Sequence, residues 1–398
     1  MKRVTVLGLG YVGLPAAIML ARAGHKVVGV DINDDVLNSI KNGEILIEDN
    51  ELKELFNTRQ VRDNLCVSKI PQGADVFLIA VPTPIDKKKK MCDMQFFKSA
   101  LNSIIGLLKK GNLIINESTT PPLTCRNFIA PIIESRTGLK VGDDILLSHC
   151  PERVLPGNIF YELINNDRII GGVNEKSAQA AADLYRTFVK GKLYITNDIT
   201  AELCKLMENA YRDVNIALVN EFSLVADGLG IDIKEAIELA NRHPRVNILK
   251  PGIGVGGHCI PLDPWFIKEV DSENSTLIAA ARRVNDMMPE KTAARVRRMI
   301  RNIKDPLIIA LGATYKPDVA DMRESPAIEV VRLLSEDGYR IKHYDPLVKG
   351  MGYDSIAGIA EGADCILILV PHTIIVKEFG SSERQIKSKM RHNIIIRF

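Results

Sequence analysis

The chain has 398 residues, of which 46% are hydrophobic and 25% charged, a balance typical of a globular protein with two or three domains. Its 52 basic and 49 acidic residues give a formal net charge of +3, so charge gives no indication of a nucleic acid or a membrane as the main partner. The seven cysteines form no Cys-x-x-Cys pair, which argues against a zinc ribbon or a disulfide framework and favours the reducing cytoplasm. We expect neither a signal peptide nor a membrane span.

Strand and helix patterns alternate through the first half of the chain. Short apolar strands are predicted at residues 4–7, 26–30, 76–81, 113–117, 145–148 and 168–171. The first helix is predicted at residues 14–23 and is closed by Gly24. This alternation is typical of a doubly wound parallel sheet covered by helices.

Strand signals vanish from about residue 198 to residue 301 and then return. Long helices are predicted at 200–230, 233–241 and 277–301. The last part of the chain carries strand patterns at 307–311, 340–344 and 365–370, with a helix at 326–337. We therefore predict an α/β protein with two Rossmann-like doubly wound domains joined by an all-α domain of long helices that serves dimerisation. The predicted boundaries are 1–197, 198–301 and 302–398.

A Gly-x-Gly-x-x-Gly motif follows the first predicted strand and opens the first helix, the context that such a motif needs to bind a dinucleotide. Gly8 permits the tight turn, Gly10 lets a diphosphate approach the backbone, and Gly13 allows close packing of helix on strand. Asp31 stands 23 residues after Gly8, at the end of the second strand, where a carboxylate accepts ribose hydroxyls and repels a 2′-phosphate. The sequence thus favours NAD over NADP, the alternative being a glycine turn without a ligand.

A glycine-rich loop at residues 251–264 leads directly to His258 and Cys259, with Asp263 four residues further on. A nucleophilic thiolate needs access and positively charged surroundings, and this loop is able to provide them. On the loop alone, an inert buried cysteine is an equally good interpretation.

Two further patterns favour structural readings when they are taken alone. Lys205, Asn209 and Arg212 share one stripe of the long helix, and by spacing this is a solvated face. No metal is predicted, because no accepted zinc spacing supports the four-ligand set that the sequence offers, His149, Cys150, His258 and Cys259.

Together, these segments resemble the UDP-glucose/GDP-mannose dehydrogenase family over nearly the whole chain. Residues 8–15 resemble its NAD motif, residues 256–263 its catalytic cysteine loop, and residues 316–326 the signature of its C-terminal domain. Within the family, residues 150–157, 211–216, 241–247 and 263–267 favour the branch that oxidises UDP-N-acetyl-D-mannosamine. Enzymes that oxidise UDP-N-acetylglucosamine at C6 share the Gly-Gly-His-Cys tetrad and are the alternative.

The resemblance implies a role for particular residues. The implied catalytic residues are Cys259 as the nucleophile, Lys205, Asp263, Asn209, Glu152 and Thr119. The implied NAD contacts are Gly8, Gly10, Tyr11, Val12, Gly13, Asp31, Thr83, Thr119 and Arg323. The implied sugar-nucleotide contacts are Arg153, Val154, Lys205, Asn209, Arg212, His243, Arg245, Gly256, Tyr315 and Lys316.

The implied reaction is a four-electron oxidation of a UDP-sugar C6 hydroxyl to the uronate with two NAD, by a homodimer in which Arg245 reaches the partner's site. Members of the family usually end with a strand followed by Asp-Thr-Arg and a short tail. This sequence departs from that pattern, because it ends with Ile394 to Phe398. Two other classes of function stay open. One is a two-electron dehydrogenase that needs no thiol, and the other is a non-catalytic protein that binds NAD or a UDP-sugar.

Overall fold

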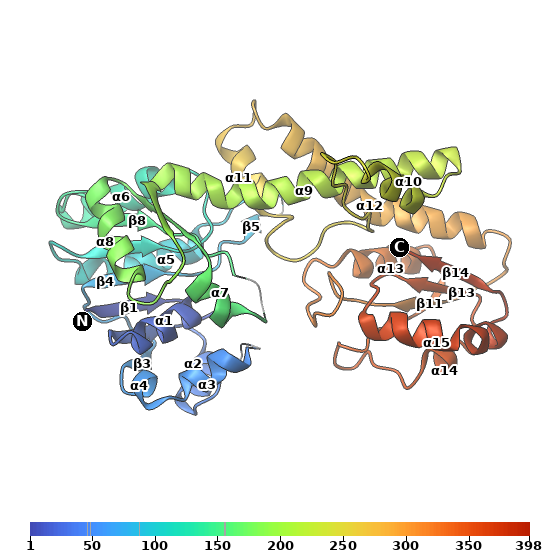
Figure 1. The fold of residues 1–398 in the computed structure, drawn as a ribbon, viewed down its shortest axis with the longest axis horizontal. Helices are drawn as coiled ribbons and strands as arrows, with labels where there is room; N and C mark the ends of the chain where they lie inside the picture. The colour runs from blue at the N-terminus through green and yellow to red at the C-terminus, as the bar shows by residue number, and fades with distance from the viewer. Residues whose placement is uncertain (46, 48, 87, 155–156) are drawn as a thin grey trace. The chain divides into compact units, whose positions relative to one another are not determined.

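The computed structural model describes residues 1–45, 47, 49–86, 88–154 and 157–398. The chain forms two compact units, the first made of Met1–Glu208 with Trp265–Ser272 and the second of Asn209–Pro264 with Glu273–Phe398. Each unit holds one Rossmann-like sheet (Figure 1). The three domain boundaries stay a prediction, because the helix α9 (Asp198–Leu229) belongs in part to each unit.

The sheet of the first unit has eight strands in the order β10-β9-β8-β7-β4-β1-β2-β3. Their bounds are β1 Arg3–Leu7, β2 Lys26–Val30, β3 Leu65–Ser68, β4 Val76–Ile79, β7 Leu113–Asn116, β8 Leu146–His149, β9 Arg168–Gly172 and β10 Leu193–Asn197. Six of them were predicted from the sequence. All neighbouring pairs are parallel except β8 and β9, which pair antiparallel. The apolar pattern of a strand does not encode its direction, so the sequence missed this reversal.

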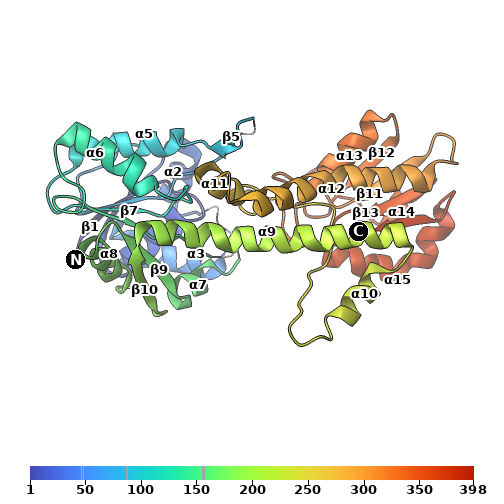
Figure 2. The ribbon, with the colours of Figure 1, turned by 90° about the horizontal axis from the view of Figure 1, so that it is seen from above.

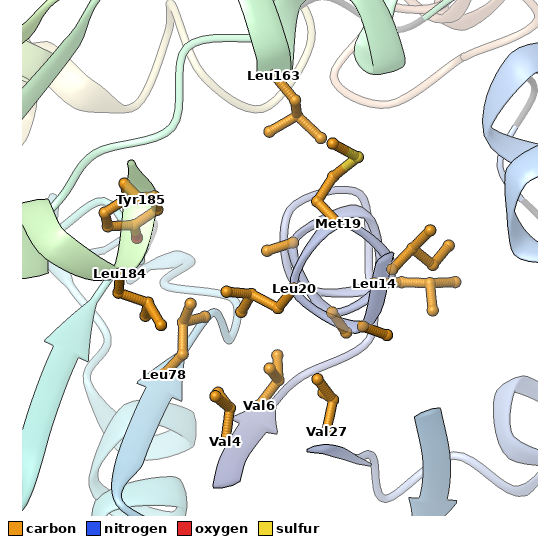
Figure 3. Close-up of a cluster of buried hydrophobic side chains, with 14 of the residues drawn as sticks. Val4, Val6, Leu14, Met19, Leu20, Val27, Leu78, Leu163, Leu184 and Tyr185 are labelled. Atoms are coloured by element: carbon orange, nitrogen blue, oxygen red, sulfur yellow. The ribbon is translucent and has the colours of Figure 1, made fainter. Parts of the chain in front are cut away.

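Helices cover both faces of this sheet. They are α1 Gly13–Arg22, α2 Asp34–Lys41, α3 Asn50–Phe56, α4 Arg59–Arg62, α5 Gln95–Ile104, α6 Ala130–Thr137, α7 Ile159–Asn165 and α8 Glu175–Tyr185. Successive side chains of a strand point to opposite faces. In β4, Val76 and Leu78 therefore join the core around α1, whereas Phe77 and Ile79 join the core beneath α5 and α6. Figure 3 shows the first of these cores gathered around α1.

Smaller elements complete the first unit. A two-stranded hairpin pairs β5 (Ile85–Asp86) with β6 (Met91–Cys92). A 3-10 turn follows α5 at Ile105–Leu107, and a π-helical turn precedes α6 at Cys125–Ile129. None of these was predicted, because segments this short carry no clear periodicity.

The middle of the chain is helical, as predicted, with no strand among residues 198–306, all of which are described. The helices are α9 Asp198–Leu229, α10 Ile233–Ala240, α11 Asp263–Val270 and α12 Thr276–Ile300. The second half of α9 runs beside α12 in both ribbon views (Figures 1 and 2). The buried guanidinium of Arg282 on α12 donates to the Asp213 carboxylate of α9, and an Asn220–Asn285 hydrogen bond of 2.9 Å lies beyond it.

The sheet of the second unit has four parallel strands in the order β12-β11-β13-β14. The strands are β11 Leu307–Leu311, β12 Arg340–Tyr344, β13 Cys365–Ile368 and β14 Ile394–Arg397, and the helices are α13 Pro326–Glu336, α14 Ile356–Ile359 and α15 Thr373–Lys389. β14 had not been predicted. No helix in the described part of the chain is long and apolar enough to cross a membrane.

The two sheets begin in the same way, a similarity that the sequence left open. In each, the amide of the glycine after the first strand, Gly8 or Gly312, donates 2.8 Å to the last carbonyl of the second strand. In each, the aspartate after the second strand accepts the amide of the residue that follows the glycine, at 2.8 Å for Asp31 and 2.6 Å for Asp345.

Candidate functional site

The turn after β1 has the geometry that a dinucleotide needs. Gly8 has φ +90°, and a Cβ there would lie 2.4 Å from the carbonyl oxygen of Ala80. A Cβ on Gly13 would lie 1.9 Å from the Gly8 oxygen, so only glycine lets α1 pack this closely. No atom lies within 4 Å of a Cβ placed on Gly10, which leaves the backbone open to a diphosphate.

Asp31 stands at the end of β2 with its carboxylate oriented by the backbone. One oxygen accepts the Leu9 amide at 2.8 Å and the other accepts the Asn33 amide at 2.9 Å. A carboxylate has about four acceptor positions, so both oxygens retain capacity for ribose hydroxyls. The α1 N-terminus lies on the same turn, and its N-cap residue Val12 supplies no side-chain acceptor. These residues fit NAD. The amides at the α1 N-terminus and the dipole of the helix suit its diphosphate.

Thr83 and Thr119 follow β4 and β7, so they belong to the same carboxyl edge of the sheet as the glycine turn. The Thr83 hydroxyl donates to the Thr119 carbonyl at 2.6 Å, which ties the two loops together. The switch in strand order between β1 and β4 is where open α/β sheets bind their ligands. The first unit thus gathers every NAD candidate except Arg323, which belongs to the second unit.

Glu152 follows β8 and is held by two donors. One oxygen accepts the amide of Arg153 at 2.7 Å, and the other accepts the guanidinium of Arg168. The Arg153 side chain pairs with Glu208 at 2.8 Å, and the Val154 side chain is half-buried. The motif at 150–157 includes residues 155 and 156, which lie outside the described residues.

Lys205 projects from the first half of α9 and influences a buried histidine at the end of β8. His149 is fully buried, and neither ring nitrogen has a hydrogen-bond partner among the residues that the structure describes. Burial, and secondarily the charge of Lys205, lowers the pKa of His149 to about 3. His149 is therefore neutral at pH 7. Within the described first unit, no ion pair joins Lys205 to a carboxylate.

The cysteine loop lies in the second unit and packs against the segment after β11. Gly257 has φ +82° and its amide donates to the Arg323 carbonyl at 3.0 Å. A Cβ on Gly256 would lie 2.5 Å from the carbonyl oxygen of Glu324, so no larger residue fits there. The Cys259 side chain is exposed at the end of this loop, as a nucleophile must be.

A chain of polar side chains supports the loop from α9. The buried Asn209 amide donates to the Asp263 carboxylate, which is itself buried, and the Arg212 guanidinium donates to the Asn209 oxygen. The Cys259 carbonyl accepts the amide of Asp263 at 2.9 Å. The structure thereby links Cys259, Asp263, Asn209 and Arg212. From their spacing alone, Asn209 and Arg212 had been expected on a solvated face of the helix.

Tyr315 and Lys316 follow β11 beside the cysteine loop. The Tyr315 ring lies 3.1 Å from the position of a Cβ on Gly257, and the Lys316 ammonium lies 5.9 Å from the centre of that ring. Desolvation, and then the charges of Asp321 and Cys259, raises the pKa of Tyr315. Arg323 forms a bidentate pair with Asp321, at 2.6 and 3.0 Å.

His243 and Arg245 are exposed on the loop after α10. The Asn241 side chain closes this loop by exchanging two hydrogen bonds, of 2.7 and 3.0 Å, with the backbone of Ile248. The amide of Arg245 donates to the His243 ring at 3.4 Å. The loop is thus closed by Asn241 and leaves His243 and Arg245 exposed.

The candidates divide between the two units. Thr119, Glu152 and Lys205 belong to the first unit, whereas Asn209, Cys259 and Asp263 belong to the second. The four residues considered as a zinc set divide in the same way. Across the described ranges, no group of three or more His, Cys, Asp or Glu side chains is placed to hold a metal ion.

Three polar residues buried beside the first-unit candidates, Glu117, Arg168 and Tyr185, were not predicted from the sequence. For Glu117 and Arg168, the available signal was a charged residue at the end of an otherwise apolar strand, whereas Tyr185 ends the helix α8 and carried no such signal. Such residues are almost never fully buried unless they are paired.

Comparison with known proteins matches the chain to one family from end to end. Models of the UDP-glucose/GDP-mannose dehydrogenase family match at residues 2–189 for the NAD binding domain, 199–287 for the central domain and 309–397 for the UDP binding domain. A UDP-N-acetyl-D-mannosamine dehydrogenase of Methanocaldococcus jannaschii is 48% identical, over 99% of this chain and 91% of that protein.

Two solved structures agree with this match. A UDP-D-ManNAc dehydrogenase from Pyrococcus horikoshii superposes with a TM-score of 0.91 at 43% identity, covering 99% of this chain and 94% of that one. The UDP-N-acetyl-mannosamine dehydrogenase of Staphylococcus aureus superposes with a TM-score of 0.88 at 43% identity and the same coverage. With an NAD-binding and a UDP-binding domain in one chain, the protein is an NAD-dependent UDP-sugar dehydrogenase and belongs to the UDP-glucose/GDP-mannose dehydrogenase family.

Proposed function

We propose that this protein oxidises the C6 hydroxyl of UDP-N-acetyl-D-mannosamine to the carboxylate, using two NAD for each sugar. The observation that carries the cysteine mechanism is the exposed thiol of Cys259 at the end of a loop fixed from two sides, by Arg323 and by Asp263. The names of the relatives at 43–48% identity support the choice of sugar.

NAD, when bound, accepts the hydride in each of the two oxidation steps. The residues that would hold it are those of the glycine turn, with Asp31 on the ribose and Thr83 and Thr119 at the same edge. Because Asp31 carries a negative charge at this position, it disfavours the 2′-phosphate of NADP.

Cys259 explains how one site performs two oxidations. The first oxidation removes a hydride and a proton from the C6 alcohol and leaves an aldehyde. The Cys259 thiolate adds to the aldehyde carbon and forms a thiohemiacetal, which becomes a thioester when it loses a hydride and a proton. Water then cleaves the carbon–sulfur bond, which releases the uronate and regenerates the thiol.

Other residues assist these steps in our proposal. The Lys205 ammonium stabilises the oxyanions of the thiohemiacetal and of the hydrolysis intermediate. Glu152, acting through a water molecule, and a neutral Lys205 are both proposed as the group that moves protons. Asn209 and Asp263 orient the cysteine loop, and Thr119 helps to position water.

We further propose that the protein works as a homodimer in the cytoplasm. In the second unit, α9 and α10 enclose an apolar groove of about 300 Å³ whose wall includes the exposed side chains of Phe222, Val225 and Ile231. An apolar surface of this kind suits a second copy of the chain, with Arg245 extending to the partner's substrate. Light scattering of the purified protein measures its mass in solution and so distinguishes a dimer from a monomer.

The experiment counts NADH and uronate formed with UDP-N-acetylmannosamine, UDP-N-acetylglucosamine and UDP-glucose. We expect two NADH per molecule of UDP-N-acetylmannosamine and slower turnover of the others. Cys259→Ser should form no uronate while its affinity for NAD is unchanged, and Cys66→Ser, which changes another exposed cysteine, should behave as the wild type. Lys205→Ala should lower kcat by about 10²-fold or more, the scale of a lost oxyanion donor.

Each alternative predicts a different count. One NADH per sugar indicates a two-electron dehydrogenase, and NAD binding without turnover indicates a non-catalytic protein. Preference for UDP-N-acetylglucosamine keeps the mechanism and changes the sugar. If Cys259→Ala still yields two NADH for each sugar, the covalent mechanism is wrong.

A further inference from the structure

A cluster of charged side chains is buried in the first unit, behind Glu152. Glu117 follows β7, Arg168 begins β9, and Tyr185 ends α8. The side chains of Glu117, Arg168 and Glu152 are only 0%, 6% and 8% exposed, and Tyr185 is fully buried. Because burying a charge costs several kcal/mol unless it is paired, the members of this cluster must compensate one another.

One guanidinium is shared between two carboxyl groups. Arg168 donates through Nη2 to the Glu152 carboxylate, and its Nη1 lies 3.8 Å from the nearer Glu117 oxygen. The guanidinium carbon lies 4.8 Å from the centre of the Tyr185 ring, and the Tyr185 hydroxyl donates to Glu117. The direct contact to Glu152 and the longer distance to Glu117 make Glu152 the principal partner of Arg168.

The charge balance of the cluster then calls for one proton. Two ionised carboxylates and one guanidinium would leave a net negative charge in a site closed to water. Glu117 is the carboxyl that the surroundings stabilise least as an anion, because its second oxygen, Oε2, has no hydrogen-bond partner in the described part of the chain. Burial, partly offset by Arg168, raises the pKa of Glu117 to about 7.

The other titratable group facing Glu117 is Cys150, which follows β8. Burial, and secondarily Glu117, raises the pKa of this thiol, so Cys150 stays uncharged. The pKa of Tyr185 is raised for the same reasons, burial first and Glu117 second. Of these three groups, Glu117 is therefore the one whose charge changes near pH 7.

We propose that Glu117, Arg168 and Tyr185 are positioning residues for Glu152, and that a protonated Glu117 leaves Arg168 to Glu152 alone. In this state Arg168 and the Arg153 amide hold the Glu152 carboxyl group in place to accept a proton in the oxidation proposed above, on which this inference rests. When Glu117 loses its proton, it competes for Arg168 and places a second negative charge beside Glu152. The cluster thus favours Glu152, rather than a neutral Lys205, as the group that moves protons.

The test compares kcat and KM of the wild type and Glu117→Gln from pH 5.5 to 9. Glutamine has the size of a protonated glutamate, accepts the Tyr185 hydroxyl and does not ionise. We expect the ratio of the two kcat values, variant over wild type, to be constant below about pH 6 and to rise at least threefold through an inflection near pH 7. The KM values for NAD and for the sugar nucleotide should stay within twofold. A residue that only stabilises the fold would not change the pH dependence of kcat while leaving both KM values unchanged.

Tyr185→Phe provides a second variant. The Tyr185 hydrogen bond lowers the pKa of Glu117, so removing it should move the wild-type inflection to higher pH. Glu202→Gln is the matched control. Glu202 is another buried carboxyl of the first unit whose pKa is raised to about 7 by burial, but its partners are the amides of Leu123 and Cys125. Its kcat ratio to the wild type should not change with pH.

Either of two outcomes overturns the inference. One is a kcat ratio for Glu117→Gln that does not change from pH 5.5 to 9, and the other is an inflection that stays at the same pH in Tyr185→Phe. These outcomes are distinct from failure of the proposed function. A wild type that forms no uronate refutes the function itself, whereas a wild type that turns over with a flat ratio refutes only the role of Glu117.

Discussion

The two Rossmann-like sheets start from the same turn but use its aspartate differently. In the first sheet, Asp31 is half-buried, and within the described part of the chain both its oxygens accept only backbone amides. In the second sheet, Asp345 is fully buried and accepts the imidazole of His372 at 3.0 Å, besides the Ala313 amide. Asp31 keeps acceptor positions that are available to a ribose, whereas Asp345 uses the corresponding positions for hydrogen bonds within the protein.

The following helix differs as well. α1 begins at Gly13, directly on the first turn, whereas α13 begins only at Pro326, after a long loop that carries Tyr315 and Arg323. The comparison teaches that a shared scaffold does not fix the ligand, because the residues after the turn decide what binds. Dinucleotide binding belongs to the first sheet. Two changes test this conclusion, and a third tests the internal role of Asp345 in the second sheet.

The largest effect is expected from Gly13→Ala. The added Cβ would meet the Gly8 oxygen at 1.9 Å, which forces the turn and α1 apart. An overpacked contact of about 3 kcal/mol corresponds to roughly 100-fold weaker NAD binding, measured by titration calorimetry. Gly312→Ala should leave the NAD affinity of the folded protein unchanged, although it too is strained. Gly106→Ala, where a Cβ meets nothing within 4 Å, is the neutral control.

Asp31→Ala should have the next largest effect. Loss of charge-assisted hydrogen bonds to the ribose of about 2–3 kcal/mol weakens NAD binding by roughly 30- to 100-fold and narrows the preference for NAD over NADP. Asp345→Ala should leave both affinities as they are. If Asp345→Ala weakened NAD binding as much as Asp31→Ala, the division of labour between the two sheets would be wrong.

The smallest effect concerns acid stability. Although burial raises the pKa of Asp345, hydrogen bonds from His372 and Ala313 outweigh it and lower the pKa from 3.8 to about 2. A lowered pKa stabilises the fold above pH 4, and this contribution, about 2 kcal/mol, is lost as the pH falls from 4 to 2. Urea unfolding at pH 6 and pH 2.5 should show a smaller pH dependence in Asp345→Asn than in the wild type. If the free energy of unfolding changed equally with pH in Asp345→Asn and in the wild type, Asp345 would not have this role.

Much of the fold was readable from the sequence because its central strands are continuous apolar runs bounded by glycine. The strands that were missed are those with weak patterns, such as β10, whose side chains are mostly exposed or half-buried. β3 and β14 likewise combine apolar and exposed residues. The sequence predicts well the strands that are buried on both faces, whereas of the edge strands of the two larger sheets only β12 was predicted.

The candidate site shows the same limit. Glycine, cysteine and aspartate were identified because they stand at fixed spacings within one segment. The partners of Glu152 were not, because Arg168 and Glu117 lie on other strands and meet it only when β7, β8 and β9 are side by side. A charged residue inside an apolar run is the one sign that such a contact exists.

The missing side-chain acceptor at the start of α1 has a practical consequence for the purified enzyme. Helices whose first turn lacks such an acceptor are less stable by about 0.5–2 kcal/mol, and a bound diphosphate would offset that loss. Preparations supplied with the dinucleotide, or with pyrophosphate alone, should therefore melt at higher temperature and resist proteolysis longer. Such a rise in melting temperature with pyrophosphate would identify the β1–α1 turn as an anion site before any substrate has been tested.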